Sequence, residues 1–255
     1  MKILAIGDVT SPGGLKHLCS KLPSVRRQYG IDLCIVNGEN ASVVIGIDDG
    51  GADELLRSGA DVITGGNHTM QNYRIHTMLD EREEVLRPIN YGNSAVGHGY
   101  TVVDTNRGRV LVINAMGNLH IDPVLDSPFP YIDRLLADMS GKYDIAVLDI
   151  HAEATGEKLA IAYNYDGIIG AVFGTHTHVP TADACILPRG TGYVSDLGMC
   201  GESGGILGMD PASVIRKIKM HMSGKLKEAD GEPFADGVIF DMSANRCVGV
   251  TRIKF

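Results

Sequence analysis

The sequence predicts a mixed α/β fold in which two mixed sheets pack together and helices lie outside them. Short apolar, β-branched runs alternate with polar segments of helical length, which is typical of a partly parallel sheet. Two further segments have the pattern of antiparallel hairpins, so strands of both directions are expected. The length of 255 residues and the apolar fraction of 44% suit one domain over residues 1–255, and no repeat or linker-like stretch divides it.

The first part of the chain alternates strands and helices. Apolar runs that end in glycine or polar residues predict buried strands at 2–7, at 31–38 and within 60–68. The segments between them predict helices at 15–30, 48–58 and about 71–83. Gly30 is a suitable stop for the first of these helices. This alternation favours parallel strands joined by helical crossovers.

The later part adds antiparallel strands. Residues 101–116 predict a hairpin with its turn at 106–108, and residues 237–253 predict a second hairpin near the end of the chain. Between the hairpins we expect helices at 128–141 and 211–222, strands at 143–151 and 167–174, and two short strands within 185–198. Two mixed sheets accommodate all of these elements.

Composition excludes several classes of function. A net charge of −8 and an aromatic content of 5%, with no Trp, argue against stable nucleic-acid binding. Five scattered cysteines without a CxxC pair indicate buried free thiols in a reducing compartment. The N-terminal stretch MKILAIGD does not resemble a signal peptide, and no apolar run is long enough to span a bilayer. We therefore expect a cytoplasmic protein without a membrane partner. Its oligomeric state stays open, a homo-oligomer included.

Polar clusters follow five of the predicted strands at the point where each strand ends. The residues are Asp8 after KILAIG, Glu39 and Asn40 after CIVNG, Asn67 and His68 after VITGG, His151 after AVLDI, and His176 and His178 in GTHTH. Each cluster alone has a structural explanation, such as a helix cap, a turn or a satisfied buried histidine. Because the carboxyl ends of strands in α/β sheets meet at one edge, five such clusters together predict a shared site.

The chemistry of these side chains indicates a metal centre. Carboxylate, amide and imidazole groups without a nearby thiolate suit iron, manganese or zinc better than calcium. The candidate ligands outnumber the positions around one four-coordinate ion, so two ions that share a carboxylate are expected. Asp149 and Glu153 flank His151 and are candidates to orient the ligands from outside.

The motifs GDV, GEN, GNH, DIHAEATGEK and GTHTH, in this order, resemble the calcineurin-like metallophosphoesterase superfamily. The blocks VNGEN, TGGNH, HAEATGEK, GTHTHVPTAD, ILPRGTGY and SDLGMCG are similar to its bacterial YmdB-like branch over essentially the whole chain. The resemblance implies a four-layer α/β/β/α sandwich of two mixed sheets. It also implies one metal held by Asp8, Glu39, Asn40 and His178, a second held by Glu39, Asn67, His151 and His176, and His68 as the proton donor.

Three departures from the family pattern bear on the site. Thr10 replaces the histidine of the superfamily's D-x-H motif, and Asn40 is the proposed substitute ligand. Gly14 stands where the branch carries an arginine after SPG, so an arginine expected near the phosphate site is absent. Residues 92–100 differ from the proline-containing form of the branch. These departures concern substrate preference more than metal binding.

The resulting hypothesis is a dinuclear phosphodiesterase that hydrolyses small cyclic nucleotides of the 2′,3′-cyclic AMP type. A hydroxide bridging two ions, iron in the first place with manganese or zinc as alternatives, would attack phosphorus, and His68 would protonate the leaving oxygen. Two alternatives remain open at this point. One is a phosphomonoesterase or nucleotidase with the same site, and the other is a metal-dependent regulatory protein that binds nucleotides and turns them over slowly.

Overall fold

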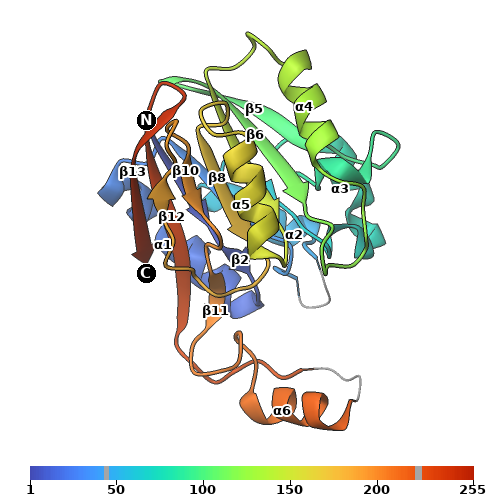
Figure 1. Cartoon of the computed structure of the whole chain (residues 1–255). Coiled ribbons are helices and arrows are strands. Elements are labelled where there is room, and N and C mark those ends of the chain that lie inside the picture. The colour runs from blue at the N-terminus through green and yellow to red at the C-terminus, as the bar shows by residue number, and fades with distance from the viewer. Residues whose placement is uncertain (43–45, 222–225) are drawn as a thin grey trace.

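The computed structural model describes residues 1–42, 46–221 and 226–255 as two mixed sheets packed face to face (Figure 1). The first sheet has the strand order β2-β11-β12-β1-β3-β4, and β13 pairs with β12. Its strands are β1 (Lys2–Ile6), β2 (Asp8–Val9), β3 (Leu33–Asn37), β4 (Val62–Thr64), β11 (Met199–Glu202), β12 (Pro233–Ser243) and β13 (Arg246–Lys254). Strands β1, β3 and β4 are mutually parallel, whereas β12 runs antiparallel to β1.

The second sheet has the order β5-β6-β7-β8-β10-β9. Its strands are β5 (Tyr100–Thr105), β6 (Gly108–Met116), β7 (Ile145–His151), β8 (Ala171–Thr175), β9 (Cys185–Ile186) and β10 (Gly192–Val194). Strands β6, β7, β8 and β10 are parallel, and the edge strands β5 and β9 are antiparallel to their neighbours. Both sheets are therefore mixed, as the sequence predicts.

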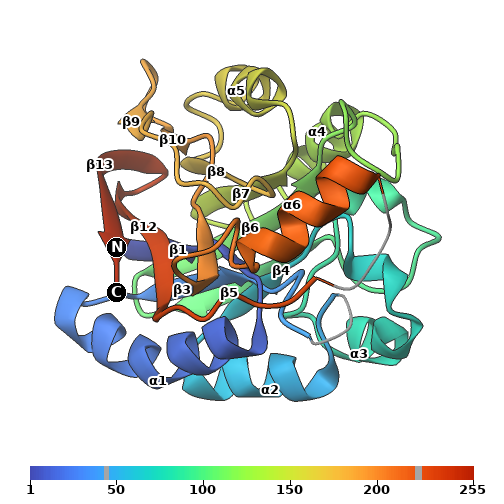
Figure 2. The same ribbon diagram turned by 90° about the horizontal axis from the view of Figure 1, so that it is seen from below.

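Helices lie on the outer face of each sheet. In Figure 2, α1 (Pro12–Tyr29) and α2 (Asp49–Ser58) lie on one side, and α4 (Phe129–Asp138) and α5 (Thr155–Asn164) lie on the other. The short α3 (His76–Glu81) follows the 3₁₀ turns η1 (Thr69–Gln71) and η2 (Tyr73–Ile75), and η3 (Ile89–Tyr91) precedes β5. Helix α6 (Pro211–Met220) stands apart from the sandwich in Figure 1. The four-layer α/β/β/α architecture is thus confirmed.

Three apolar cores separate the four layers, because successive side chains of a strand point to opposite faces. On β1, Ile3 and Ala5 belong to the core between the sheets, whereas Leu4 and Ile6 pack toward α1 and α2. On β7, Val147 faces the core between the sheets, and its neighbours Ala146 and Leu148 pack toward α4 and α5. The middle strands of both sheets are therefore buried on both sides, which explains their continuous apolar runs.

Several expected elements are confirmed and others are wrong. The strands at the start of the chain, both hairpins and the first two helices lie where the sequence predicts them, and Gly30 caps α1 with φ of 67°. The helix expected at about 71–83 is replaced by two 3₁₀ turns and α3, whose N-terminus has no side-chain cap. Helix α5 is missing from the prediction, since it has Gly156 in its first turn and no side-chain cap at its N-terminus. Residue 222, the predicted end of the 211–222 helix, lies outside the described residues.

Two expectations from composition have structural counterparts. None of the helices in the described ranges is long and apolar enough to cross a membrane. All five cysteines are free, and Cys34, Cys200 and Cys247 are buried. Cys185 is exposed on the short edge strand β9, so the expectation of buried thiols is wrong at that position.

Candidate metal centre

The predicted site residues come together at the edge where the parallel strands end, which is the lower edge in Figure 1 and faces the reader in Figure 2. The first sheet provides Asp8 beyond β1, Glu39 beyond β3 and Asn67 beyond β4. The second sheet provides His151 at the end of β7 and the GTHTH stretch at the end of β8. Parallel register brings residues that are far apart in the sequence to one edge.

Two groups of side chains at this edge could each hold a cation. Within the described residues, Glu39, His151 and His176 form one group, and Asp8, Glu39 and His178 form the other. In each group the potential ligand atoms lie within 4.8 Å of one another. Glu39 belongs to both groups, which is the arrangement that two neighbouring ions with a shared carboxylate require.

The first group converges on the Nε2 atom of His151. This nitrogen lies 3.2 Å from Glu39 Oε2, 3.0 Å from Asn67 Oδ1 and 3.1 Å from His176 Nδ1. All of these atoms carry lone pairs when each histidine is neutral and has its proton on the other ring nitrogen. Lone pairs from four side chains therefore face a common point, an arrangement that a cation stabilises.

A chain of hydrogen bonds sets the orientation of the His151 ring. His151 Nδ1 lies 2.9 Å from Thr175 Oγ1, and the Thr175 hydroxyl donates to Asp149 Oδ1 at 2.8 Å. The other carboxylate oxygen of Asp149 accepts from Thr64 Oγ1 at 2.5 Å and from Asn37 Nδ2 at 3.1 Å. Because the Thr175 hydroxyl donates its proton to the Asp149 carboxylate, its oxygen acts as an acceptor toward His151, and Nδ1 of the ring carries the proton. The lone pair of Nε2 is then directed at the cluster.

Burial and mutual charge shift the pKa values in the cluster. Burial and the neighbouring Glu39 carboxylate raise the pKa of Asp8 well above its usual range. Burial also acts on Glu39, but His151 and His68 outweigh it and hold that pKa well below its usual range. Burial opposes protonation of His151, yet Glu39 and Asp8 raise its pKa to about 9. Without a cation, a proton on His151 therefore compensates the charge of Glu39.

The pKa values of His176 and His178, the two histidines beyond β8, are lowered rather than raised. Burial and the neighbouring His151 lower the pKa of His176 to about 4. Burial likewise lowers the pKa of His178. Both imidazoles are therefore neutral at neutral pH, which is the form that binds metal ions.

Unpaired atoms and a glycine show that the cluster fits a cation. Asp8 Oδ1 and His178 Nε2 are buried and have no hydrogen-bond partner, although a buried polar atom without a partner is normally destabilising. A Cβ on Gly66 would lie 2.3 Å from Glu39 Oε2 and 2.4 Å from His151 Nε2. The missing side chain thus leaves open the space that these two ligand atoms face.

His68 and Asn40 lie beside the shared carboxylate. His68 has a side chain that is 30% exposed, and its Nδ1 lies 3.4 Å from Glu39 Oε1. The Asn40 amide donates to Glu39 Oε1 at 2.7 Å. On the solvent side, Glu153 Oε2 lies 3.1 Å from His176 Nε2. The structure therefore brings every predicted site residue to this edge, with His68 facing the more open side.

The structure also explains two departures from the family motifs. The Thr10 hydroxyl donates to the Cys200 carbonyl at 3.0 Å and is therefore directed at β11. Gly14 packs α1 against the same strand, and a Cβ there would lie 2.3 Å from the Cys200 carbonyl oxygen. An arginine cannot be accommodated at position 14 without moving α1 away from β11.

Sequence reasoning did not identify Asn37, Thr175, Lys158 or Asp196 as residues of the site. Asn37 and Thr175 lie inside the VNGEN and GTHTH motifs, so their position next to ligand residues was the available signal. Lys158 and Asp196 form a buried ion pair of 2.9 Å behind the GTHTH stretch. Nothing in the spacing of these two residues indicates that they meet.

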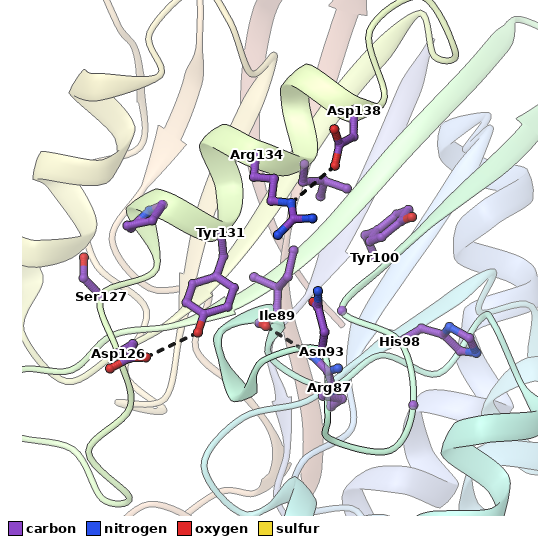
Figure 3. A pocket seen from close by; sticks show the side chains of 14 residues that line it. Arg87, Ile89, Asn93, His98, Tyr100, Asp126, Ser127, Tyr131, Arg134 and Asp138 are labelled. Carbon is purple, nitrogen blue, oxygen red and sulfur yellow. Dashed lines mark hydrogen bonds and ion pairs between the residues drawn. The ribbon is translucent and has the colours of Figure 1, made fainter.

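A cavity of about 760 Å³ lies away from these ligands, between α4 and the segment before β5 (Figure 3). His98 and Tyr100 line it, so the differing segment 92–100 borders this cavity. The Arg87 guanidinium donates to the backbone carbonyls of Pro88, Ile89, Gly92, Ala95 and Val96. Arg87 therefore fixes the backbone of the segment that borders the cavity. All of its guanidinium N–H groups are used in these bonds, so none is left to bind an anion.

Comparisons with known proteins agree with the fold and the motifs. The 2′,3′-cyclic-nucleotide 2′-phosphodiesterase of Bacillus subtilis is 39% identical over 255 residues, covering 99% of this chain and 96% of that protein. The crystal structure of a hypothetical protein from Thermus thermophilus matches with a TM-score of 0.92 at 35% identity, covering 100% of this chain and 99% of that one. A phosphatase from Mycoplasma pneumoniae matches with a TM-score of 0.91 at 29% identity, covering 100% and 93%. Residues 4–253 match the model of the YmdB-like proteins, which confirms the resemblance in the motifs, and the chain belongs to this family.

Proposed function

We propose that this protein is a metal-dependent phosphodiesterase that hydrolyses 2′,3′-cyclic nucleotides at a dinuclear centre. The observation that carries the proposal is the position of Glu39, whose carboxylate belongs to both groups of potential ligands. A carboxylate shared by two ions is typical of two-metal phosphoester hydrolases. Membership of the YmdB-like family supports the coarser class, a phosphoric ester hydrolase.

The ligand sets divide between the two groups. Asp8, Glu39, Asn40 and His178 would hold one ion, and Glu39, Asn67, His151 and His176 would hold the other. The mixed oxygen and nitrogen donors suit iron, with manganese or zinc as alternatives. When bound, such ions provide a nucleophile at neutral pH and neutralise charge that develops on phosphoryl oxygens.

His68 is the proposed proton donor to the leaving oxygen. Its side chain is 30% exposed and its Nδ1 lies 3.4 Å from Glu39 Oε1, so Nε2 is the nitrogen left for the substrate. The backbone N–H of His68 also donates to Glu39 Oε2 at 3.3 Å, so the residue is held beside the shared ligand. A positioned imidazolium accelerates departure of an alkoxide by about 10²–10⁴-fold.

The name of the Bacillus subtilis relative supports cyclic nucleotides as the substrate class. Breaking the 2′ ester of a 2′,3′-cyclic phosphate leaves a nucleoside 3′-monophosphate, so this is the expected product. The net charge of −8 disfavours long polyanions, whereas local cations would attract a small anionic ester. A mononucleotide therefore suits the site better than a nucleic-acid strand.

A substrate panel tests the proposal. The metal-loaded protein is assayed with 2′,3′-cyclic AMP, 3′,5′-cyclic AMP, the AMP monoesters and an aryl phosphodiester, and products are separated by chromatography. We expect 2′,3′-cyclic AMP to have the highest kcat/KM and to yield 3′-AMP. Preferred hydrolysis of the monoesters would instead identify a phosphomonoesterase, in line with the phosphatase from Mycoplasma pneumoniae. Tight nucleotide binding with negligible turnover would identify a regulatory binding protein.

A further inference from the structure

The two histidines beyond β8 have backbone conformations that need support from their surroundings. His176 has φ of 105° and His178 has φ of 63°. Residues other than glycine rarely occupy this left-handed region, and they persist there where neighbouring contacts over-determine the conformation. The question is which contacts hold the histidine loop, residues 175–178, in this shape.

Lys158 fixes the start of the histidine loop. This residue of α5 is 0% exposed, and its Nζ donates to the Thr175 carbonyl at 2.8 Å. The Ala152 N–H donates to the same carbonyl over a longer distance of 3.4 Å. The lysine stem packs over Gly174, where a Cβ would lie 2.6 Å from Lys158 Cδ. The lysine therefore sets the point at which the loop leaves β8.

Asp196 fixes the middle of the loop. Its Oδ2 accepts from Lys158 Nζ at 2.9 Å and from the Thr177 N–H at 3.0 Å. Its Oδ1 accepts from the Gly198 N–H at 3.0 Å, so both oxygens are engaged. Thr177 lies between the two histidines, so the hydrogen bond from its N–H to Asp196 restrains the backbone of both.

The buried ion pair of Lys158 and Asp196 has hydrogen bonds to the loop backbone that a contribution to fold stability alone does not explain. A buried ion pair usually contributes little net stability, because desolvation of the two charges offsets their attraction. Here the charges of Lys158 and Asp196 cancel, while Lys158 Nζ also donates to the Thr175 carbonyl and Asp196 Oδ2 also accepts from the Thr177 N–H, on either side of His176. The pair can therefore brace the loop without adding net charge beside a cationic centre.

We infer that Lys158 and Asp196 are positioning residues that hold His176 and His178 ready to bind metal. Lys158 anchors Thr175, Asp196 anchors Thr177, and the Asp8 carboxylate accepts the His176 N–H at 3.0 Å from the opposite side. Because His176 and His178 belong to different ligand groups, loosening the loop weakens both of them. This inference rests on the metal centre of the proposed function.

Titration of metal-free protein with Mn²⁺ tests the inference, using calorimetry and electron paramagnetic resonance. Lys158→Met removes the donor to Thr175 and keeps an unbranched apolar stem. We expect both binding steps to weaken, by about 10–100-fold, as for other residues that orient metal ligands. Asp196→Asn keeps the side-chain volume and provides a second variant if Lys158→Met does not fold.

Arg26→Met is the matched control. It removes a different ion pair, Arg26–Asp61 at 2.7 Å, which lies between α1 and the residue before β4. This variant should lose stability without any change in Mn²⁺ affinity. A second measurement uses ¹⁵N-labelled histidine in metal-free protein, where the ring signals of His176 and His178 should shift in Lys158→Met and stay in place in Arg26→Met.

The outcomes separate this inference from the proposed function. A parent protein that binds no Mn²⁺ would remove the metal centre itself, and the positioning role with it. A parent that binds two ions, with unchanged affinity and unchanged histidine signals in both Lys158→Met and Asp196→Asn, would overturn the positioning role alone. The pair would then be an ordinary buried ion pair of the fold.

Discussion

The two sheets contribute different halves of the candidate centre. The first sheet provides the proposed oxygen ligands Asp8, Glu39 and Asn67, which are at most 8% exposed and lie just beyond the ends of the parallel strands β1, β3 and β4. The second sheet provides the histidines, and two of these lie in a loop with left-handed backbone. We call the two sets the oxygen half and the histidine half. The positions of the oxygen half therefore follow from strand register, whereas the positions of the histidine half depend on buried hydrogen bonds behind the loop.

The largest effect is expected at the residue that joins the two halves. Glu39→Gln keeps the shape of the side chain but removes the charge shared by both groups. We expect both metal ions to be lost and turnover to fall by about 10³-fold or more, since two-metal stabilisation is worth several kcal/mol. Elemental mass spectrometry and a 2′,3′-cyclic AMP assay measure these effects.

Two companion variants sharpen this prediction. Glu81→Gln, at an exposed position at the end of α3, should behave like the parent protein. His178→Ala should remove one ion, because His178 belongs to one group. Loss of a single ion in Glu39→Gln would contradict its shared role.

His68 should separate catalysis from metal binding. His68→Ala removes the proposed proton donor but no proposed ligand, so we expect parent metal content and turnover lower by about 10²–10⁴-fold. His98→Ala is the control, because His98 lines the separate cavity. Loss of metal in His68→Ala would show that this residue belongs to the ligand set.

Gly66 tests whether the metal ions bind in the space between Glu39 of the first sheet and His151 of the second sheet. Gly66→Ala places a methyl group against Glu39 Oε2 and His151 Nε2. Overpacking of about 1–3 kcal/mol corresponds to a loss of metal affinity of about 10–100-fold, measured by Mn²⁺ titration. Gly156→Ala on α5 is the control, since its Cβ would meet no atom within 4 Å. If Gly66→Ala and Gly156→Ala bind Mn²⁺ with equal affinity, the ions do not bind in the space beside Gly66.

An effect confined to one of the two ligand groups is expected from Asp149, which lies behind His151. Asp149→Asn weakens the bond that orients the Thr175 hydroxyl and, through it, the His151 ring. We expect metal affinity to fall by about 10–100-fold at the Glu39–His151–His176 group and much less at the other group. The control Asp144→Asn alters a more exposed carboxylate just before β7. Equal weakening of both groups would refute a selective role for Asp149.

The strand framework, and with it the meeting of Asp8 and Glu39 at one edge, could be predicted from the sequence for a physical reason. Apolar runs of strand length identify β1, β3, β7 and β8, and parallel strands place their end residues at a common edge. Asp8 and Glu39 could therefore be recognised as partners although 31 positions separate them. The same argument recovers His151, which is the last residue of β7.

The supporting network could not be predicted in the same way. Lys158 lies on α5, a helix that the sequence does not reveal because Gly156 and an uncapped N-terminus weaken its signal. Its contact with Asp196 depends on the packing of α5 over β8, which spacing does not encode. The left-handed backbone of His176 and His178 is likewise a consequence of tertiary contacts rather than of local propensity.

The number of bound metal ions tests whether this edge of the sheets holds a dinuclear centre. The protein is purified without added metal, and its ions are counted by elemental mass spectrometry beside an Asp8→Asn, His176→Ala double variant, which alters one ligand from each sheet. We expect about two transition-metal ions per chain in the parent and their loss in the variant. A parent that contains no metal, and takes up neither iron, manganese nor zinc when these are supplied, would contradict this expectation.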